Sequence, residues 1–131
     1  MNQGYYSQPT ISQTHISFVS DDDLWLVSKE GGIAQRLTSN HGHLNSPCFS
    51  PDGKWLAFSS SDTALESDIY IMPAEGGEAK RLTWLGASRI IGWKDNETLY
   101  CLSGMEGYPR RETHVYELNI LTQDFKMINL G

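Results

Sequence analysis

The sequence is poor in clustered positive charge. Lysine and arginine number 10 against 16 aspartates and glutamates, which gives a net charge of -6 and a pI of about 5.0. Basic residues adjoin one another only at Lys80–Arg81 and Arg110–Arg111. Because nucleic acids and anionic membrane surfaces are bound through clustered cations, we expect neither of them as a partner.

Long apolar runs and cysteines are also scarce. No stretch approaches the roughly 20 apolar residues that cross a bilayer, and residues 1–6 resemble no signal peptide. We therefore expect a cytoplasmic protein. The two cysteines, Cys48 and Cys101, lie among apolar residues, so we expect both to be buried, reduced thiols.

Catalytic and metal-binding signatures are missing as well. Residues 86–90 (GASRI) lack the closing glycine of a G-x-S-x-G elbow, and no H-E-x-x-H, P-loop or G-x-G-x-x-G occurs. His41 and His43 supply only two metal ligands, and Asp21–Asp23 supplies at most three of the six or more oxygens that calcium needs. We expect a chain that is not itself catalytic and holds no cofactor or metal.

What the sequence does contain is an internal repeat. Residues 24–38 (LWLVSKEGGIAQRLT) match residues 69–83 (IYIMPAEGGEAKRLT) position for position, at an offset of 45. A weaker third copy covers residues 115–128. Each copy is preceded by two further apolar segments around a turn, as in residues 47–58 (PCFSPDGKWLAF). Each unit therefore holds four short strands, the signature of a β-propeller blade.

This pattern predicts an all-β fold, a β-propeller with three four-stranded antiparallel blades. We place blade 1 at about 8–38, blade 2 at about 46–83 and blade 3 at about 88–130, within a single propeller segment covering residues 1–131. The turn SPDGK suits a type I turn that ends in a left-handed Gly53. The polar last strand, AKRLT, suits the outer edge of a blade.

Several conspicuous side chains receive a structural interpretation. Trp55, Trp84 and Trp93 could form a stacking platform, but strand positions in a repeat favour packing between blades. Asp23 and Asp68 occupy equivalent positions, and we expect them to accept hydrogen bonds from local backbone at the turn into the third strand.

The repeat resembles a known family. SPDGKWLAFSS and SDIYIMPAEGGEAKRLT are similar to the WD40-like PD40 repeat of TolB-type and tricorn-type propellers. Residues 15–42, HISFVSDDDLWLVSKEGGIAQRLTSNHG, resemble the opening blade of tricorn proteases, and residues 128–131 resemble the close of the third blade there. The resemblance runs from about Pro9 to Gly131.

The resemblance implies a function for the larger protein. Tricorn-type enzymes are cytosolic serine peptidases that shorten oligopeptides, and they begin with a six-bladed propeller. This chain would then be half of that ring, a non-catalytic scaffold and a channel or gate for peptide substrates and products. In the link between blades 2 and 3, Arg89 resembles part of the basic pair that binds a substrate's C-terminal carboxylate. Arg110–Arg111 reads as surface charge.

Half a ring leaves two blade faces without a neighbour, and such apolar faces usually mark an interface. We therefore expect self-association through these faces, with two copies closing a six-bladed ring by two-fold symmetry. Two alternatives stay open: a TolB-like module that binds a protein partner, and a self-assembling half-propeller fragment.

Overall fold

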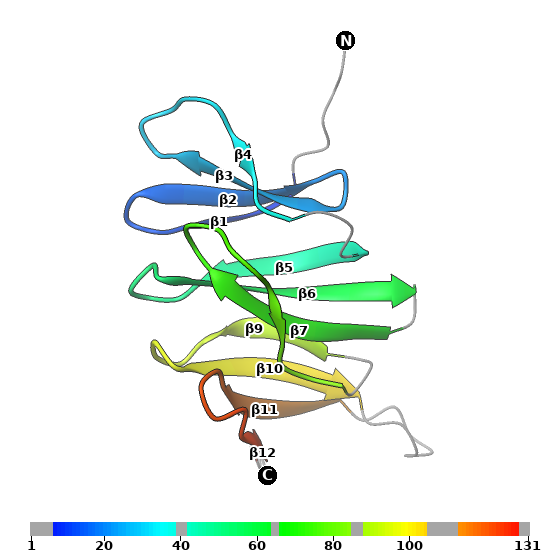
Figure 1. Ribbon diagram of the computed structural model, residues 1–131. Coiled ribbons are helices and arrows are strands. Elements are labelled where there is room, and N and C mark those ends of the chain that lie inside the picture. The colour runs from blue at the N-terminus through cyan, green and yellow to red at the C-terminus, as the bar shows by residue number, and fades with distance from the viewer. Residues whose placement is uncertain (1–6, 39–41, 64–65, 85–87, 105–112, 129–131) are drawn as a thin grey trace.

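Every regular element that the structure describes is a β-strand. The computed structural model describes residues 7–38, 42–63, 66–84, 88–104 and 113–128. Within them, twelve strands form three four-stranded antiparallel sheets, and each sheet comes from one continuous part of the chain. Figure 1 shows the three sheets stacked face to face in chain order. The predicted all-β, three-bladed architecture is confirmed.

Each sheet is one blade, and its strands lie side by side in chain order. Blade 1 holds β1 (Ser7–Ile11), β2 (His15–Ser20), β3 (Asp23–Ser28) and β4 (Gln35–Arg36). Blade 2 holds β5 (His43–Phe49), β6 (Trp55–Thr63), β7 (Glu66–Pro73) and β8 (Lys80–Arg81). Blade 3 holds β9 (Ser88–Trp93), β10 (Thr98–Gly104), β11 (Thr113–Asn119) and β12 (Phe125–Met127).

The turn between β5 and β6 shows how local chemistry sets the strand pairing. Gly53 has a φ of 74°, a left-handed conformation that favours glycine, and its N–H donates to the Ser50 carbonyl at 2.8 Å. The Asp52 carboxylate accepts from the Ser50 hydroxyl at 2.6 Å and from the Lys54 N–H at 3.0 Å. The Ser50 hydrogen bond is the main reason that the pKa of Asp52 is lowered. The turn thus closes on itself and leads directly into β6.

The three blades can be aligned residue by residue through one recurring hydrogen bond. The N–H of Leu37 donates to Leu24 at 2.8 Å, that of Leu82 to Ile69 at 2.7 Å, and that of Ile128 to Val115 at 2.8 Å. Equivalent residues of blades 1 and 2 in these hairpins are therefore 45 positions apart, and those of blades 2 and 3 are 46 apart.

Two hydrophobic cores lie between the blades. The first joins blades 1 and 2, and its buried residues are Val19, Leu24, Leu26, Leu44, Phe49, Leu56, Phe58, Met72 and Ala74. The second joins blades 2 and 3, and its buried residues are Ala57, Ile69, Ile71, Leu82, Leu99, Cys101, Tyr116, Leu118 and Ile120. Blade 2 therefore buries both of its faces, which explains why residues 69–72 of β7 are apolar on both faces of the strand.

We call the face of a blade that points to the preceding blade its upstream face and the other its downstream face. In blade 1 the upstream face has no neighbour within the described chain. It carries Ile16, Phe18, Trp25 and Val27, which are paired across β2 and β3 and only partly buried. The equivalent residues in blade 2 are Leu56, Phe58, Tyr70 and Met72, which pack into the first core.

Candidate functional site

The first strands of the three blades form a shared inner edge. β1 contacts β5, and β5 contacts β9. Two hydrogen bonds tie these strands together across the blade boundaries. The Phe49 N–H donates to the Thr10 hydroxyl at 3.2 Å, and the indole N–H of Trp93 donates to the Cys48 carbonyl at 3.1 Å. The fourth strands β4, β8 and β12 consequently lie at the outer edges, as predicted from the polar strand AKRLT of blade 2.

Arg89 lies at this inner edge. It is the second residue of β9, stands opposite Leu102 in the sheet register, and has an exposed side chain. Among the described residues no carboxylate forms an ion pair with it. An exposed guanidinium can bind a carboxylate through two parallel hydrogen bonds. Residues 85–87, which precede this strand, and Arg110–Arg111 lie outside the described residues.

The acidic run at 21–23 builds a turn. Asp21 and Asp22 have φ values of 51° and 61°, so both central residues of the β2–β3 hairpin are left-handed. Such turns match the twist of antiparallel strands, and aspartate tolerates this conformation better than most residues. The Asp22 carboxylate lies 3.3 Å from Nδ1 of His43 on blade 2. His41 lies outside the described residues, and the described part of the chain brings no three His, Cys, Asp or Glu side chains together as metal ligands.

Asp23 and Asp68 have partners that the sequence did not reveal. The Thr38 hydroxyl donates to Asp23 at 2.9 Å and accepts from the Leu24 N–H at 3.0 Å. The donating hydroxyl comes from the end of the fourth strand, a partner that the expected hydrogen bonds to local backbone do not include. The signal was present in the sequence as the repeated Arg-Leu-Thr, but the threonine had no assigned role.

Blade 2 repeats this arrangement more tightly. The Thr83 hydroxyl donates to Asp68 at 2.6 Å and accepts from the Ile69 N–H at 3.0 Å. Nη2 of Arg81 also donates to the Asp68 carboxylate, at 2.7 Å. We call this set the Asp–Thr–Arg latch, because it fastens the fourth strand to the start of the third. Its members hold the blade together and point to no ligand.

The latch is looser in blade 1 and changed in blade 3. In blade 1 the Arg36 guanidinium lies 3.9 Å from Asp23. In blade 3 the equivalent positions hold His114 and Met127, as the cross-strand pairs of Tyr70 with Arg81 and of Tyr116 with Met127 show. There the ring of Tyr116 stacks on Phe125, with ring centroids 4.3 Å apart, so an aromatic contact joins the two strands.

Trp55, Trp84 and Trp93, which could have formed a stacking platform, divide into two groups. Trp55 and Trp93 pack against the second core, as expected for residues between blades. The prediction was wrong for Trp84, whose side chain is 66% exposed. Trp84 follows β8 at the outer edge of blade 2, and the Arg81 guanidinium lies 5.3 Å from its ring centroid.

Both cysteines are free thiols. Cys101 is fully buried in the second core, and burial raises its pKa to about 12. Cys48 is partly buried at the inner edge, and burial raises its pKa as well. The described residues also contain no helix long and apolar enough to span a membrane.

Comparison with known families identifies a close match in sequence. Residues 3–131 match the model of the tricorn protease N-terminal beta propeller domain. A tricorn-like protease N-terminal subunit from Sulfurisphaera tokodaii is 31% identical over 134 residues, which cover 98% of this chain and 68% of that one. Against two longer tricorn protease homologues, from Streptomyces coelicolor and Saccharolobus solfataricus, the chain spans only 8% and 11% of their length.

Solved structures agree with the sequence matches. The crystal structure of the tricorn protease superimposes with a TM-score of 0.81 at 25% identity, over 98% of this chain and 14% of that chain. A TolB structure from Agrobacterium tumefaciens superimposes with a TM-score of 0.83 at 20% identity, over 99% of this chain and 48% of that chain. The second match establishes a common fold and nothing further.

Proposed function

The chain belongs to the family of tricorn protease N-terminal beta propeller domains, and from that premise we propose that it is a non-catalytic segment of a tricorn-like serine peptidase. In this role it acts as a scaffold and as a channel or gate through which oligopeptides reach or leave the catalytic domains. We place this role in the cytoplasm, the compartment that the resemblance to tricorn-type peptidases implies.

The observation that carries the scaffold role is the upstream face of blade 1. Phe18 is equivalent to Phe58 of blade 2 and to Cys101 of blade 3, since each pairs with the aromatic residue at the same position of the next strand. Phe58 and Cys101 have no exposed surface, because a preceding blade covers them. A face of this composition in blade 1 is suited to packing on a further blade.

The downstream face of blade 3 is the other open end. It carries Tyr100, Leu102 and Val115, which are only partly buried. Glu117 takes the position of the buried Ile71 and lies 3.0 Å from the Lys94 ammonium. In a two-fold dimer of half-rings, this face of one copy would cover the upstream face of blade 1 of the other copy.

Self-association is tested by sedimentation velocity on the chain at tens of micromolar. We expect a dimer, and we expect Phe18→Glu to give a monomer because it places a charge in the apolar interface. Ile33→Glu is the matched control, since Ile33 is 96% exposed and outside this face. A wild-type monomer, or a Phe18→Glu dimer, would contradict ring closure by a second copy. If Phe18→Glu fails to fold, Val27→Lys makes the same test at the edge of the face.

The gate role assigns peptide binding to Arg89, through the C-terminal carboxylate of the peptide. In the peptidase that contains or binds this chain, Arg89→Gln should raise KM for peptides with a free carboxylate and leave amidated peptides unchanged. Loss of one charged hydrogen-bonding partner predicts about a tenfold change. Equal effects on both peptides would contradict this role, and peptide hydrolysis by the pure chain alone would overturn the non-catalytic assignment.

A protein-binding role like that of a TolB-type module is the alternative. It rests on the shared fold, and no contact in the described residues favours it over the peptidase role.

A further inference from the structure

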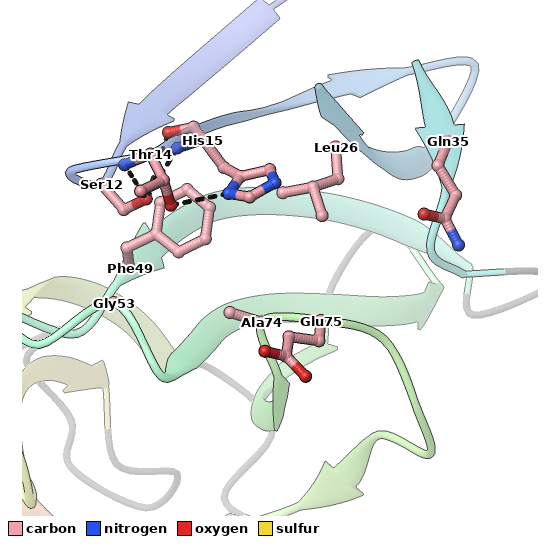
Figure 2. Close-up of a pocket in the computed structure, with 9 residues that line it drawn as sticks. All are labelled: Ser12, Thr14, His15, Leu26, Gln35, Phe49, Gly53, Ala74 and Glu75. Carbon is pink, nitrogen blue, oxygen red and sulfur yellow. Dashed lines mark hydrogen bonds between the residues drawn. The ribbon is translucent and has the colours of Figure 1, made fainter. Parts of the chain in front are cut away.

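A pocket opens between blades 1 and 2. Its volume is about 240 Å³. Leu26, Phe49 and Ala74 supply its apolar walls, and His15, Gln35 and Glu75 supply polar groups. Figure 2 shows the His15 imidazole projecting toward Leu26 from the blade 1 side, with Ala74 and Glu75 on the blade 2 side.

The same space between blades 2 and 3 is filled by larger side chains. Trp55 stands at the position of His15, because the pairs of Trp55 with Pro73 and of His15 with Ser28 are equivalent in register. Its indole packs against the second core. An imidazole is much smaller than an indole, so the change from Trp55 to His15 is enough to open a gap between blades 1 and 2.

Two more positions enlarge the gap in the same way. Phe49 is replaced by Trp93 in blade 3, as the pairs with Leu56 and Leu99 show. Ile120 of blade 3 stands at the position of Ala74. The Ala74 N–H donates to the Lys54 carbonyl, and the Ile120 N–H makes the equivalent hydrogen bond to the Glu97 carbonyl. Ile120 is 5% exposed and belongs to the second core. Each of these three residues is smaller than the residue at the equivalent position of the interface between blades 2 and 3. Together the three differences produce the pocket.

The polar groups of the pocket include unused hydrogen-bonding capacity. The Thr14 hydroxyl lies 2.8 Å from Nδ1 of His15 and holds the ring, which leaves Nε2 as the nitrogen on the pocket side (Figure 2). Within the described chain, no cation forms an ion pair with the Glu75 carboxylate. Gln35, the first residue of β4, also lines the pocket. A carboxylate and an amide oxygen beside an apolar floor accept hydrogen bonds from a cationic donor.

We propose that this pocket binds a small apolar group that carries a primary ammonium, such as the first residue of a peptide. The hydrocarbon part would occupy the floor of Leu26, Phe49 and Ala74, and the ammonium would donate to the Glu75 carboxylate. The volume is sufficient, because a protein cavity of about 150 Å³ holds benzene. The inference does not rest on the peptidase role, since the pocket lies between two blades of this chain.

The test is a titration of the ¹⁵N-labelled chain with leucinamide, followed by amide chemical shifts. We expect saturable shifts at residues that line the pocket. The matched neutral ligand is 4-methylpentanamide, which keeps the isobutyl and amide groups and lacks the ammonium. It should bind at least about tenfold more weakly, the loss expected for one charge-assisted hydrogen bond.

Variants separate the pocket from the rest of the surface. Glu75→Gln should weaken leucinamide binding by about tenfold, whereas Glu78→Gln, a change at an exposed carboxylate of the same turn, should leave it unchanged. His15→Trp copies Trp55 and should abolish binding by filling the pocket. If that variant does not fold, Ala74→Ile copies Ile120 and makes the same test. Unsaturable shifts, equal binding of the neutral amide, or undiminished binding by a folded filling variant would each overturn the proposal.

Discussion

The Thr83 hydroxyl donates a 2.6 Å hydrogen bond to the Asp68 carboxylate, and both residues are buried. The same hydroxyl accepts from the Ile69 N–H, so one threonine satisfies a backbone donor and a buried charge together. This pair, with Arg81, fixes the outer strand of blade 2 at a point where β8 is only two residues long. Side-chain hydrogen bonds therefore hold β8 in place, whereas a longer strand would be held by backbone hydrogen bonds.

The first prediction concerns the unequal strength of the two latches. Asp68→Ala should lower the free energy of unfolding by about 3 kcal/mol, because it leaves a buried hydroxyl and a guanidinium without their acceptor. Asp23→Ala should cost only about 1 kcal/mol, since Asp23 is more exposed and lies 3.9 Å from its arginine. Urea denaturation of the two variants measures the difference. Equal losses would show that the arginine distance does not matter.

The second prediction concerns the turn at 50–55. Gly53→Ala should cost about 1–2 kcal/mol, because alanine resists a φ of 74°. The cost is conformational, as an added Cβ would meet Ser12 at an ordinary 3.5 Å. Gly92→Ala serves as the control, since Gly92 has no left-handed φ and open space around its Cα. Thermal or urea unfolding of both variants checks the prediction, which fails if the two changes cost the same.

Strands and turns could be predicted from the sequence because they depend on neighbours in the chain. The repeat at an offset of 45 reports the blade period, and the proline and glycine of SPDGK report one hairpin. Apolar residues on both faces of β7 indicated a strand covered on both sides. All of these are local patterns, and the structure has the three sheets that they predict.

Contacts between strands could not be predicted in the same way. The partner of Asp68 lies 15 residues away, and it is specified only once the register of β7 with β8 is known. The prediction for Trp84 was wrong because the exposure of this residue depends on its position after β8, the edge strand of blade 2. The pocket beside His15 becomes recognisable only when the side-chain volumes at equivalent positions of two interfaces are compared.

The third prediction concerns the contact between β5 and β9, the first strands of blades 2 and 3. Trp93→Phe should cost about 2 kcal/mol, because it removes the 3.1 Å hydrogen bond to the Cys48 carbonyl and leaves space in the second core. Trp84→Phe, at an exposed position, should cost no more than about 0.5 kcal/mol. Denaturant midpoints of the two variants make the comparison. A Trp84→Phe loss as large as that of Trp93→Phe would contradict the assignment of Trp93 as the cross-blade link.

The last prediction concerns alkaline pH. Burial raises the pKa of the Cys101 thiol to about 12, from 9.0 for an exposed cysteine. Between these values the folded protein keeps a proton that the unfolded chain has lost. The free energy of unfolding should therefore keep its full value below about pH 9 and fall as the pH rises toward 12. The slope for one group is at most about 1.4 kcal/mol per pH unit. Cys101→Ala lacks this slope and keeps every other titrating group. Urea denaturation at pH 8 and pH 10 should therefore show that the free energy of unfolding falls by about 1 kcal/mol more in the wild type than in the variant. Equal losses in the two proteins would mean that Cys101 ionises inside the folded core.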